Sequence, residues 1–238
     1  MTGGGTATAV EVAADALRDA VLARGDGERL GSEEDLLERI GVSRPTLRQA
    51  ARLLESEELL VVRRGVNGGL FARRPSTDAV ARMASVYLRA EGTTVVDLAR
   101  SWFLLLEQSA RLAAEHPDEA VRRRLSERAA DLEAAIRASG QSPGSAVVHT
   151  FALDLADASG SSTLRLFVRV LSTVIAGLAP DVRAVGRVPE LHVDVLANLA
   201  QVATAVETGD SEWAARAMRR HAEPMMKWLL AQMPDRLA

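Results

Sequence analysis

The sequence of 238 residues predicts a mainly α-helical protein with one small β-hairpin, organised as two domains. Three observations predict this fold. Two short capped helices meet at a tight turn that contains Gly41. Two short β-branched segments then flank a glycine-rich turn at residues 65–69. Beyond Pro75, apolar residues keep a helical spacing through the rest of the sequence, with no strand pattern.

The N-terminal domain is expected to begin with two helices that follow a flexible tail at residues 1–8. Residues 10–23 place apolar side chains on one helical face, and the glycines at 25 and 27 end that helix. Ser32 caps the second helix, and Asp35, three residues later, completes an approximate capping box. Gly41 ends this helix and starts the turn into a third one, so the pair predicts a helix-turn-helix.

The third helix has two chemically different faces. Ser43 suits the N-cap position, and Pro45 suits the first turn, where a missing N–H breaks no hydrogen bond. One face is apolar and carries Leu47, Ala50, Ala51 and Leu54. The other face presents Arg48, Gln49 and Arg52, with Arg44 at its border. Arginine suits bidentate contacts with phosphate or guanine, which indicates a DNA recognition helix. Taken alone, the stretch fits an ordinary surface helix with solvated charges equally well.

A β-hairpin is expected directly after the third helix. Residues 59–64 and 70–73 are apolar and partly β-branched, which is typical of strands, and the turn at 65–69 joins them. A helix-turn-helix followed by a hairpin makes a winged helix. Arg63 and Arg64 lead into the wing and Asn67 lies at its tip, so the wing is expected to follow a DNA backbone. A structural lid over the small core is the alternative.

The two expected domains are the winged helix-turn-helix at residues 9–75 and an all-helical bundle at residues 76–238. Pro75 ends the last strand, and glycines and prolines separate the later segments. The pattern predicts a bundle of six or seven helices. These are expected at about residues 77–91, 94–116, 118–138, 144–158, 161–178, 189–208 and 211–234.

Composition and charge narrow the class of protein. The absence of cysteine excludes disulfides and cysteine-based metal or nucleophilic sites. No apolar run reaches the roughly 20 residues of a membrane helix, and the first residues lack the pattern of a signal peptide. A cytoplasmic protein without membrane contact is therefore expected. The net charge is −3, but residues 41–75 hold seven arginines and three glutamates, a local charge of +4.

No arrangement of residues predicts an enzyme. The sequence shows no nucleophile–base pattern, no glycine-rich phosphate loop before a helix and no carboxylate cluster with ligand spacing. Asp154 and Asp157 lie beside the expected pocket helix, but a solvated helix face explains them about as well. Catalysis by the helical domain is therefore not expected.

Several segments resemble the GntR family of bacterial transcription regulators. In the N-terminal domain they are residues 32–36, 41–50 and the Arg-Arg-Gly-Val-Asn-Gly-Gly run at 63–69. The helical domain resembles the FCD effector domain of the FadR-type subgroup, through residues 106–114, 151–160 and 209–221. By position, the resemblance implies DNA contacts from Ser43, Arg44, Thr46, Arg48, Arg64 and Gly65.

Two positions depart from the family pattern in the DNA-binding domain. Glu34 stands where many members have an arginine that contacts phosphate, and Pro45 replaces a commoner small polar residue. Adding the polar helix face and the wing tip gives the full set of DNA-contact candidates: Ser43, Arg44, Pro45, Thr46, Arg48, Gln49, Arg52, Arg64, Gly65 and Asn67.

The FCD resemblance also implies a divalent metal, held by an Asp-x-x-x-His pair and two histidines on later helices. Such ligands suit zinc, nickel or manganese. The matching positions are Val148, Ala152, Leu199 and His221, so only His221 retains a donor atom. No metal cofactor is therefore expected. The expected site is an apolar effector pocket lined by Phe103, Val148, Ala152 and Leu199, with His221 as its polar group.

A metal site rebuilt from His149, His192 and His221 is the alternative. A helix turns about 100° per residue, so His149 faces away from the position of Val148. An apolar pocket favours a lipid-like effector such as a fatty acyl thioester. A small acid bound through His221 is the second candidate.

The leading functional hypothesis is a ligand-responsive transcription regulator. It is expected to bind an inverted-repeat DNA operator as a homodimer, and a small-molecule effector in the helical domain would shift its DNA affinity. The alternative is a ligand-sensing or scaffolding helical protein with weak or lost DNA binding. The arginines at positions 44, 48 and 64 argue against that alternative.

Overall fold

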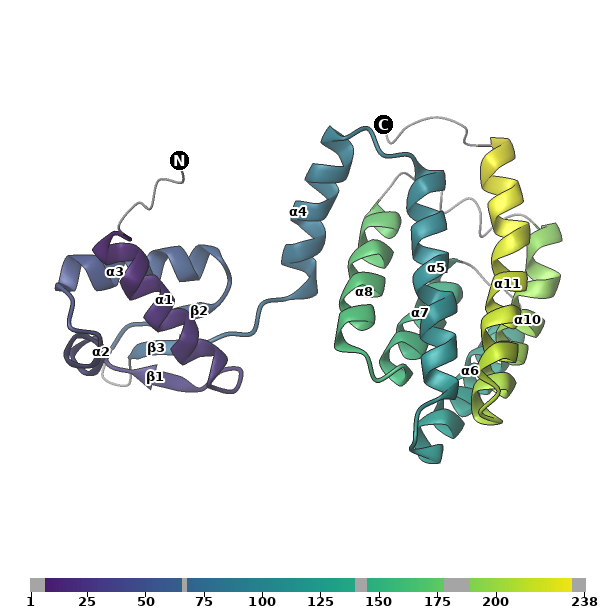
Figure 1. Cartoon of the computed structure of the whole chain (residues 1–238), viewed down its shortest axis with the longest axis horizontal. Helices are drawn as coiled ribbons and strands as arrows, with labels where there is room; N and C mark the ends of the chain where they lie inside the picture. The colour runs from purple at the N-terminus through teal and green to yellow at the C-terminus, as the bar shows by residue number, and fades with distance from the viewer. Residues whose placement is uncertain (1–6, 66–67, 140–144, 178–188, 233–238) are drawn as a thin grey trace, which may run out of the picture. The chain divides into compact units, whose positions relative to one another are not determined.

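The computed structural model describes residues 7–65, 68–139, 145–177 and 189–232. Its contacts divide the chain into two compact units, Met1–Ala79 and Val80–Ala238, each with its own hydrophobic core. The predicted fold class is confirmed, because the described residues form ten helices and three short strands (Figure 1). The division falls inside helix α4 (Thr77–Ala90) rather than at the predicted boundary after Pro75.

The first unit combines three helices with a small antiparallel sheet. Its elements are α1 (Ala9–Leu22), β1 (Arg29–Gly31), α2 (Glu33–Ile40), α3 (Arg44–Ser56), β2 (Leu60–Arg63) and β3 (Gly69–Ala72). The apolar face of α3 packs mainly against α1. The unit's core is built from one side of each element, and its largest fully buried side chains are Leu17, Leu36, Leu47, Leu54 and Leu60.

Side-chain caps set where these helices begin. The backbone N–H of Asp35 donates to Ser32 Oγ at 3.1 Å, and the backbone N–H of Ser32 donates to Asp35 Oδ2 at 2.8 Å, which confirms the predicted capping box. These hydrogen bonds lower the pKa of Asp35. Thr8, predicted to lie in a flexible tail, forms a second capping box with Glu11 and starts α1. The tail prediction was therefore wrong for Thr8.

The sheet has three strands in the order β1-β3-β2, not the two strands of the predicted hairpin. Strand β2 pairs antiparallel with β3, as the predicted hairpin requires, and Val61 lies opposite Phe71. The additional strand β1 pairs with the other edge of β3, so Arg29 lies opposite Phe71 as well. Gly69 stands where β3 meets β1. Its φ is 141°, and a Cβ built on it would lie 2.5 Å from the carbonyl oxygen of Gly31.

The second unit is an all-helical bundle. It contains most of α4 together with α5 (Val95–Ala114), α6 (Glu119–Ser139), α7 (Ser145–Ala158), α8 (Ser162–Gly177), α10 (Pro189–Glu207) and α11 (Ser211–Gln232). The seven predicted helices are all present, with ends within two residues of their expected positions. None of the described helices is long and apolar enough to cross a membrane.

Helix α5 is the central element of the second unit, because it packs against α7, α8, α10 and α11 (Figure 1). Leu106 of α5, Phe151 and Leu155 of α7 and Met218 of α11 are fully buried in the shared core. Trp102 anchors α5 to α8 through a buried hydrogen bond, in which its Nε1 donates to Ser172 Oγ at 2.9 Å. Residues from many helices therefore converge around α5.

We predict that Gly69→Ala lowers the free energy of unfolding of the first unit by about 2 kcal/mol, because the new Cβ meets the Gly31 carbonyl at a positive φ. Gly27→Ala is the matched control, since Gly27 has a φ of 77° and no atom within 4 Å of an added Cβ. It is expected to cost only about 1 kcal/mol. Urea titration followed by hydrogen exchange at the amides of the first unit measures both. Equal losses of the free energy of unfolding in the two variants would show that a Cβ at position 69 does not clash with the Gly31 carbonyl.

Candidate nucleic-acid interface and effector site

Helix α3 presents the two faces that its sequence predicted. Leu47, Ala50, Ala51 and Leu54 are buried in the core of the first unit. Arg44, Pro45, Arg48, Gln49 and Arg52 are exposed on the remaining surface of the same helix. Five of the ten DNA-contact candidates therefore lie together on an accessible helix face. The unit's core leaves that face free for an external partner.

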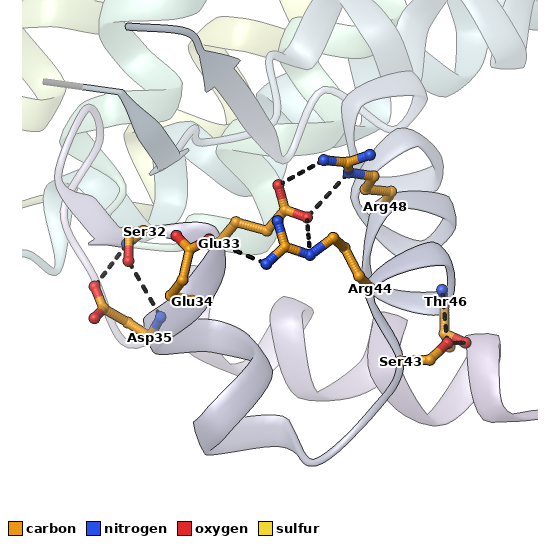
Figure 2. Close-up of polar contacts among 8 residues, drawn as sticks. All are labelled: Ser32, Glu33, Glu34, Asp35, Ser43, Arg44, Thr46 and Arg48. Carbon is orange, nitrogen blue, oxygen red and sulfur yellow. Dashed lines mark hydrogen bonds and ion pairs between the residues drawn. The ribbon is translucent and has the colours of Figure 1, made fainter. Parts of the chain in front are cut away.

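Two exposed guanidinium groups of α3, those of Arg44 and Arg48, form ion pairs with glutamates of α2 (Figure 2). Arg48 donates from Nε to Glu33 Oε1 at 3.0 Å and from Nη2 to Glu33 Oε2 at 3.2 Å, which makes a bidentate pair. Arg44 donates from Nη2 to Glu34 Oε1 at 3.2 Å, and its Nε lies 3.7 Å from Glu33 Oε1. The local charge of +4 counted along residues 41–75 omits these two acids, which come from the preceding helix.

The hydroxyl groups of Ser43 and Thr46, at the start of α3, contact each other. Ser43 Oγ lies 2.7 Å from Thr46 Oγ1 and accepts from the backbone N–H of Thr46 at 3.4 Å, which confirms Ser43 as the N-cap. Ser43 is exposed and Thr46 is half-buried. Both hydroxyls can still turn a lone pair or a hydrogen outwards, because a hydroxyl can donate one hydrogen bond and accept others.

The two arginines of the wing, Arg63 and Arg64, lie in different environments. The guanidinium of Arg63 lies 4.3 Å from the centroid of the Phe71 ring and forms a cation–π contact within the sheet. Arg64 and Gly65 are exposed, as a DNA-contacting wing requires. Asn67, predicted at the wing tip, lies outside the described residues. Sequence reasoning missed Arg29 of β1, whose Nη2 donates to the carbonyl of Gly68 at 3.1 Å and braces the base of the wing.

The five predicted effector-pocket residues lie in the interior of the second unit. Phe103, Val148, Ala152 and Leu199 belong to one buried cluster. His221 is 3% exposed, and its ring lies edge-on to Phe103 with 6.2 Å between the two ring centroids. Neither ring nitrogen of His221 has a hydrogen-bond partner among the described residues. Burial lowers the pKa of His221 to about 4, so its imidazole is neutral at pH 7.

The residues at the positions of the family's metal ligands do not fit a metal ion. Val148, Ala152 and Leu199 offer no donor atom, and a single imidazole cannot hold a divalent ion tightly. His149 is half-buried, and burial together with the positive charge of Arg169 lowers its pKa. The structure does not describe the side chain of His192. Where side chains are described, no group of three or more potential ligands comes together.

Asp154 and Asp157 of α7 both form ion pairs. Asp157 accepts from Arg169 Nη2 at 2.8 Å, and Asp154 Oδ2 lies 3.4 Å from Arg128 Nε. Asp157 is exposed, as a solvated surface requires, whereas Asp154 Oδ2 is buried and has no hydrogen-bond partner among the described residues, so the interpretation fits Asp157 but not Asp154.

We predict that His221 makes the second unit acid-sensitive. Its pKa is about 4 in the folded chain and about 6.5 in the unfolded chain, so between these values only the unfolded chain gains the proton. His221 therefore does not reduce the free energy of unfolding above pH 6.5. This free energy falls by up to about 3 kcal/mol as the pH drops from 6.5 to 4. Urea titrations followed by tryptophan fluorescence measure it, because all three tryptophans lie in this unit.

In the His221→Leu variant this part of the pH dependence is expected to disappear. His116→Gln is the matched control and is expected to retain it, because His116 is only half-buried and its Nδ1 accepts a hydrogen bond from Asp118. Identical pH dependence in the parent and in His221→Leu would show that the buried ring does not control acid stability.

Each of the two units matches a known protein family. The family described as bacterial regulatory proteins, gntR family, matches residues 9–67, and the FCD domain family matches residues 97–224. No curated protein sequence matches the chain closely enough to count as a relative.

The fold is similar to that of a solved GntR structure from Streptococcus agalactiae. The Streptococcus agalactiae GntR structure is 23% identical with a TM-score of 0.68, over 92% of this chain and 99% of that chain. Two further structures are E. coli McbR/YncC, 16% identical with a TM-score of 0.44, and Lar, which controls the expression of the Listeria monocytogenes agr system, 14% identical with a TM-score of 0.47. They cover 95% and 96% of this chain and 99% and 100% of their own chains. Because the family matches span the helix-turn-helix and more than half of the whole sequence, the chain belongs to the gntR family of bacterial regulatory proteins and is a DNA-binding transcription regulator with an FCD effector-binding domain.

Proposed function

We propose that this regulator binds an inverted-repeat DNA operator as a homodimer, with α3 and the wing of β2 and β3 as its reading elements. The observation that carries the proposal is the division of α3 into a buried apolar face and an exposed face with three arginines. Arginine is the side chain whose paired N–H groups match guanine and phosphate. Arg64 and Gly65 of the wing supply a second exposed contact beside it.

Dimerisation follows from the small size of one reading head. Helix α3 has 13 residues, and the N-terminal part of such a helix reaches only a few base pairs in a major groove. A few base pairs recur many times in any genome, so one head cannot select a unique site. Two heads related by a two-fold axis read a two-fold symmetric site and double the recognised length.

One observation favours the second candidate, a regulator-like protein with weak DNA binding. Arg44 and Arg48 already have carboxylate partners, so binding to phosphate requires exchange of one anion for another. Both arginine side chains are nevertheless at least half exposed. Exposed ion pairs contribute only about 0–1 kcal/mol, which DNA contacts can replace. The first candidate is therefore the better supported.

The effector proposed for the FCD domain has an apolar body and an uncharged polar group. Phe103, Val148, Ala152 and Leu199 supply apolar contacts, and His221 has one donor and one acceptor without partners. A neutral imidazole gives no ion pair to a carboxylate, which favours the carbonyl of a fatty acyl thioester over a small acid. Native mass spectrometry of the protein from its own host identifies the bound compound.

We predict that Arg44→Ala and Arg48→Ala each weaken DNA binding by about 1–3 kcal/mol, because each removes a bidentate donor. The probe is a duplex that the full-length parent selects from a random-sequence pool, and fluorescence anisotropy gives the affinity. Arg24→Ala is the matched control, since it removes the same charge from an exposed position of the same unit. It is expected to keep nearly the parent affinity.

The selected sequences are expected to show two-fold symmetry. Parent-like affinity of both α3 variants would remove α3 as the reader. Failure of the parent to select any sequence would favour the second candidate.

We also predict that the purified regulator contains no stoichiometric transition metal, because three of the four ligand positions lack donor atoms. Elemental analysis measures the metal content, and thermal unfolding with and without a chelator checks its effect on stability. The melting temperature is expected to be the same in both. One metal ion per chain, lost together with thermal stability on chelation, would instead indicate a rebuilt site that uses His149, His192 and His221.

A further inference from the structure

Two neighbouring glutamates at the start of α2 contact the recognition arginines in different ways (Figure 2). Glu33 is only 26% exposed and accepts two hydrogen bonds from Arg48, through both of its carboxylate oxygens. Glu34 is 70% exposed and accepts one hydrogen bond, from Arg44. Their different burial and geometry suggest different effects on DNA binding.

The position of the Glu33 carboxylate is fixed by the fold. Glu33 is the first residue of α2, directly after the Ser32 cap. Leu36, one turn further along, is fully buried and fixes the helix to the core, and Leu47 does the same for α3. The carboxylate and the guanidinium therefore face each other from two anchored helices rather than from flexible segments.

The bidentate contact determines which hydrogens of Arg48 remain available. Arginine has five N–H groups, one on Nε and two on each terminal nitrogen. Glu33 takes the edge formed by Nε and Nη2, with contacts of 3.0 and 3.2 Å. Among the residues that the structure describes, no hydrogen bond is made by the edge formed by Nη1 and the second hydrogen of Nη2. Two parallel donors at that edge match O6 and N7 of guanine.

Holding that edge in place reduces the entropic cost of recognition. Arg48 is 61% exposed, and a long exposed side chain samples many rotamers when it is unpaired. The Glu33 contact limits these rotamers before DNA arrives. A pre-oriented donor edge loses less entropy on binding and discriminates more strongly between guanine and other bases.

Glu34 lacks these features. One exposed contact restricts Arg44 weakly, and a carboxylate at this surface repels approaching phosphates. Its effect on DNA is expected to be independent of sequence, because the phosphate backbone is the same for every site.

We propose that Glu33 is a specificity-determining positioning residue, which acts on DNA through the guanidinium of Arg48, whereas Glu34 only lowers the affinity for DNA of any sequence. This inference rests on the proposed DNA-binding function. Glu34 thus provides a control of equal charge, one residue away in the same helix.

The test compares Glu33→Gln, Glu33→Asp and Glu34→Gln in the full-length protein. Affinities are measured by fluorescence anisotropy for a duplex selected by the parent and for an unrelated duplex of equal length. Both Glu33 variants are expected to lower the ratio of the two affinities about tenfold. Glu33→Asp keeps the charge but is one methylene shorter, so it separates geometry from charge. Glu34→Gln is expected to raise both affinities several-fold and leave their ratio unchanged.

A double-mutant cycle with Arg48→Ala tests whether Glu33 acts through that arginine. In the Arg48→Ala background, Glu33→Gln is expected to leave the affinity ratio unchanged. Melting temperatures equal to that of the parent show that the variants are folded. The proposal is overturned if Glu33→Gln and Glu34→Gln shift both duplexes by the same factor, or if Glu33→Asp retains the parent ratio. If the parent selects no sequence, the proposed function itself fails.

Discussion

Burial of one face of α3 is the constraint on which the first unit depends. Leu47 and Leu54 are fully buried, and they fix the helix against α1 and the core beneath the sheet. Because side chains radiate around a helix, burial of this face forces Arg44 and Arg48 onto the outside. The exposed, arginine-bearing face of α3 is thus a direct consequence of hydrophobic packing, and α2, β2 and β3 are placed around it by contact with the same core.

The exposed arginines combine accessibility with order. An unpaired surface arginine is accessible but has many conformations, whereas a buried ion pair is ordered but inaccessible. Here the carboxylates of α2 lie beside the guanidinium groups and leave each arginine side chain at least half exposed. The ion pairs reduce the positive charge that attracts DNA, and they restrict the directions in which the arginines can donate. If Glu33 orients Arg48 as proposed, selectivity between DNA sequences depends on Glu33, and attraction to any DNA depends on Glu34.

The second unit buries one polar side chain, His221, in an apolar interior. A buried imidazole without partners is costly, because its nitrogens lose their hydrogen bonds to water. Neutralisation limits that cost, which is why the pKa of His221 is about 4. A ligand that supplied a donor or an acceptor to His221 would recover the lost hydrogen bond.

Local sequence signals were sufficient to predict most of the elements of the fold. The helix-turn-helix, the hairpin and the seven later helices were predicted because caps and apolar periodicity act within a few residues. The exposure of Arg48 was predicted from the helical pattern, whereas the interior positions of Phe103 and His221 were implied by the family resemblance. Tertiary structure alone decided the pairing of β1 with β3 and the contact of Glu33 with Arg48, 15 residues apart. Neither has a local pattern, because a three-residue strand and a surface ion pair exist only once distant segments meet.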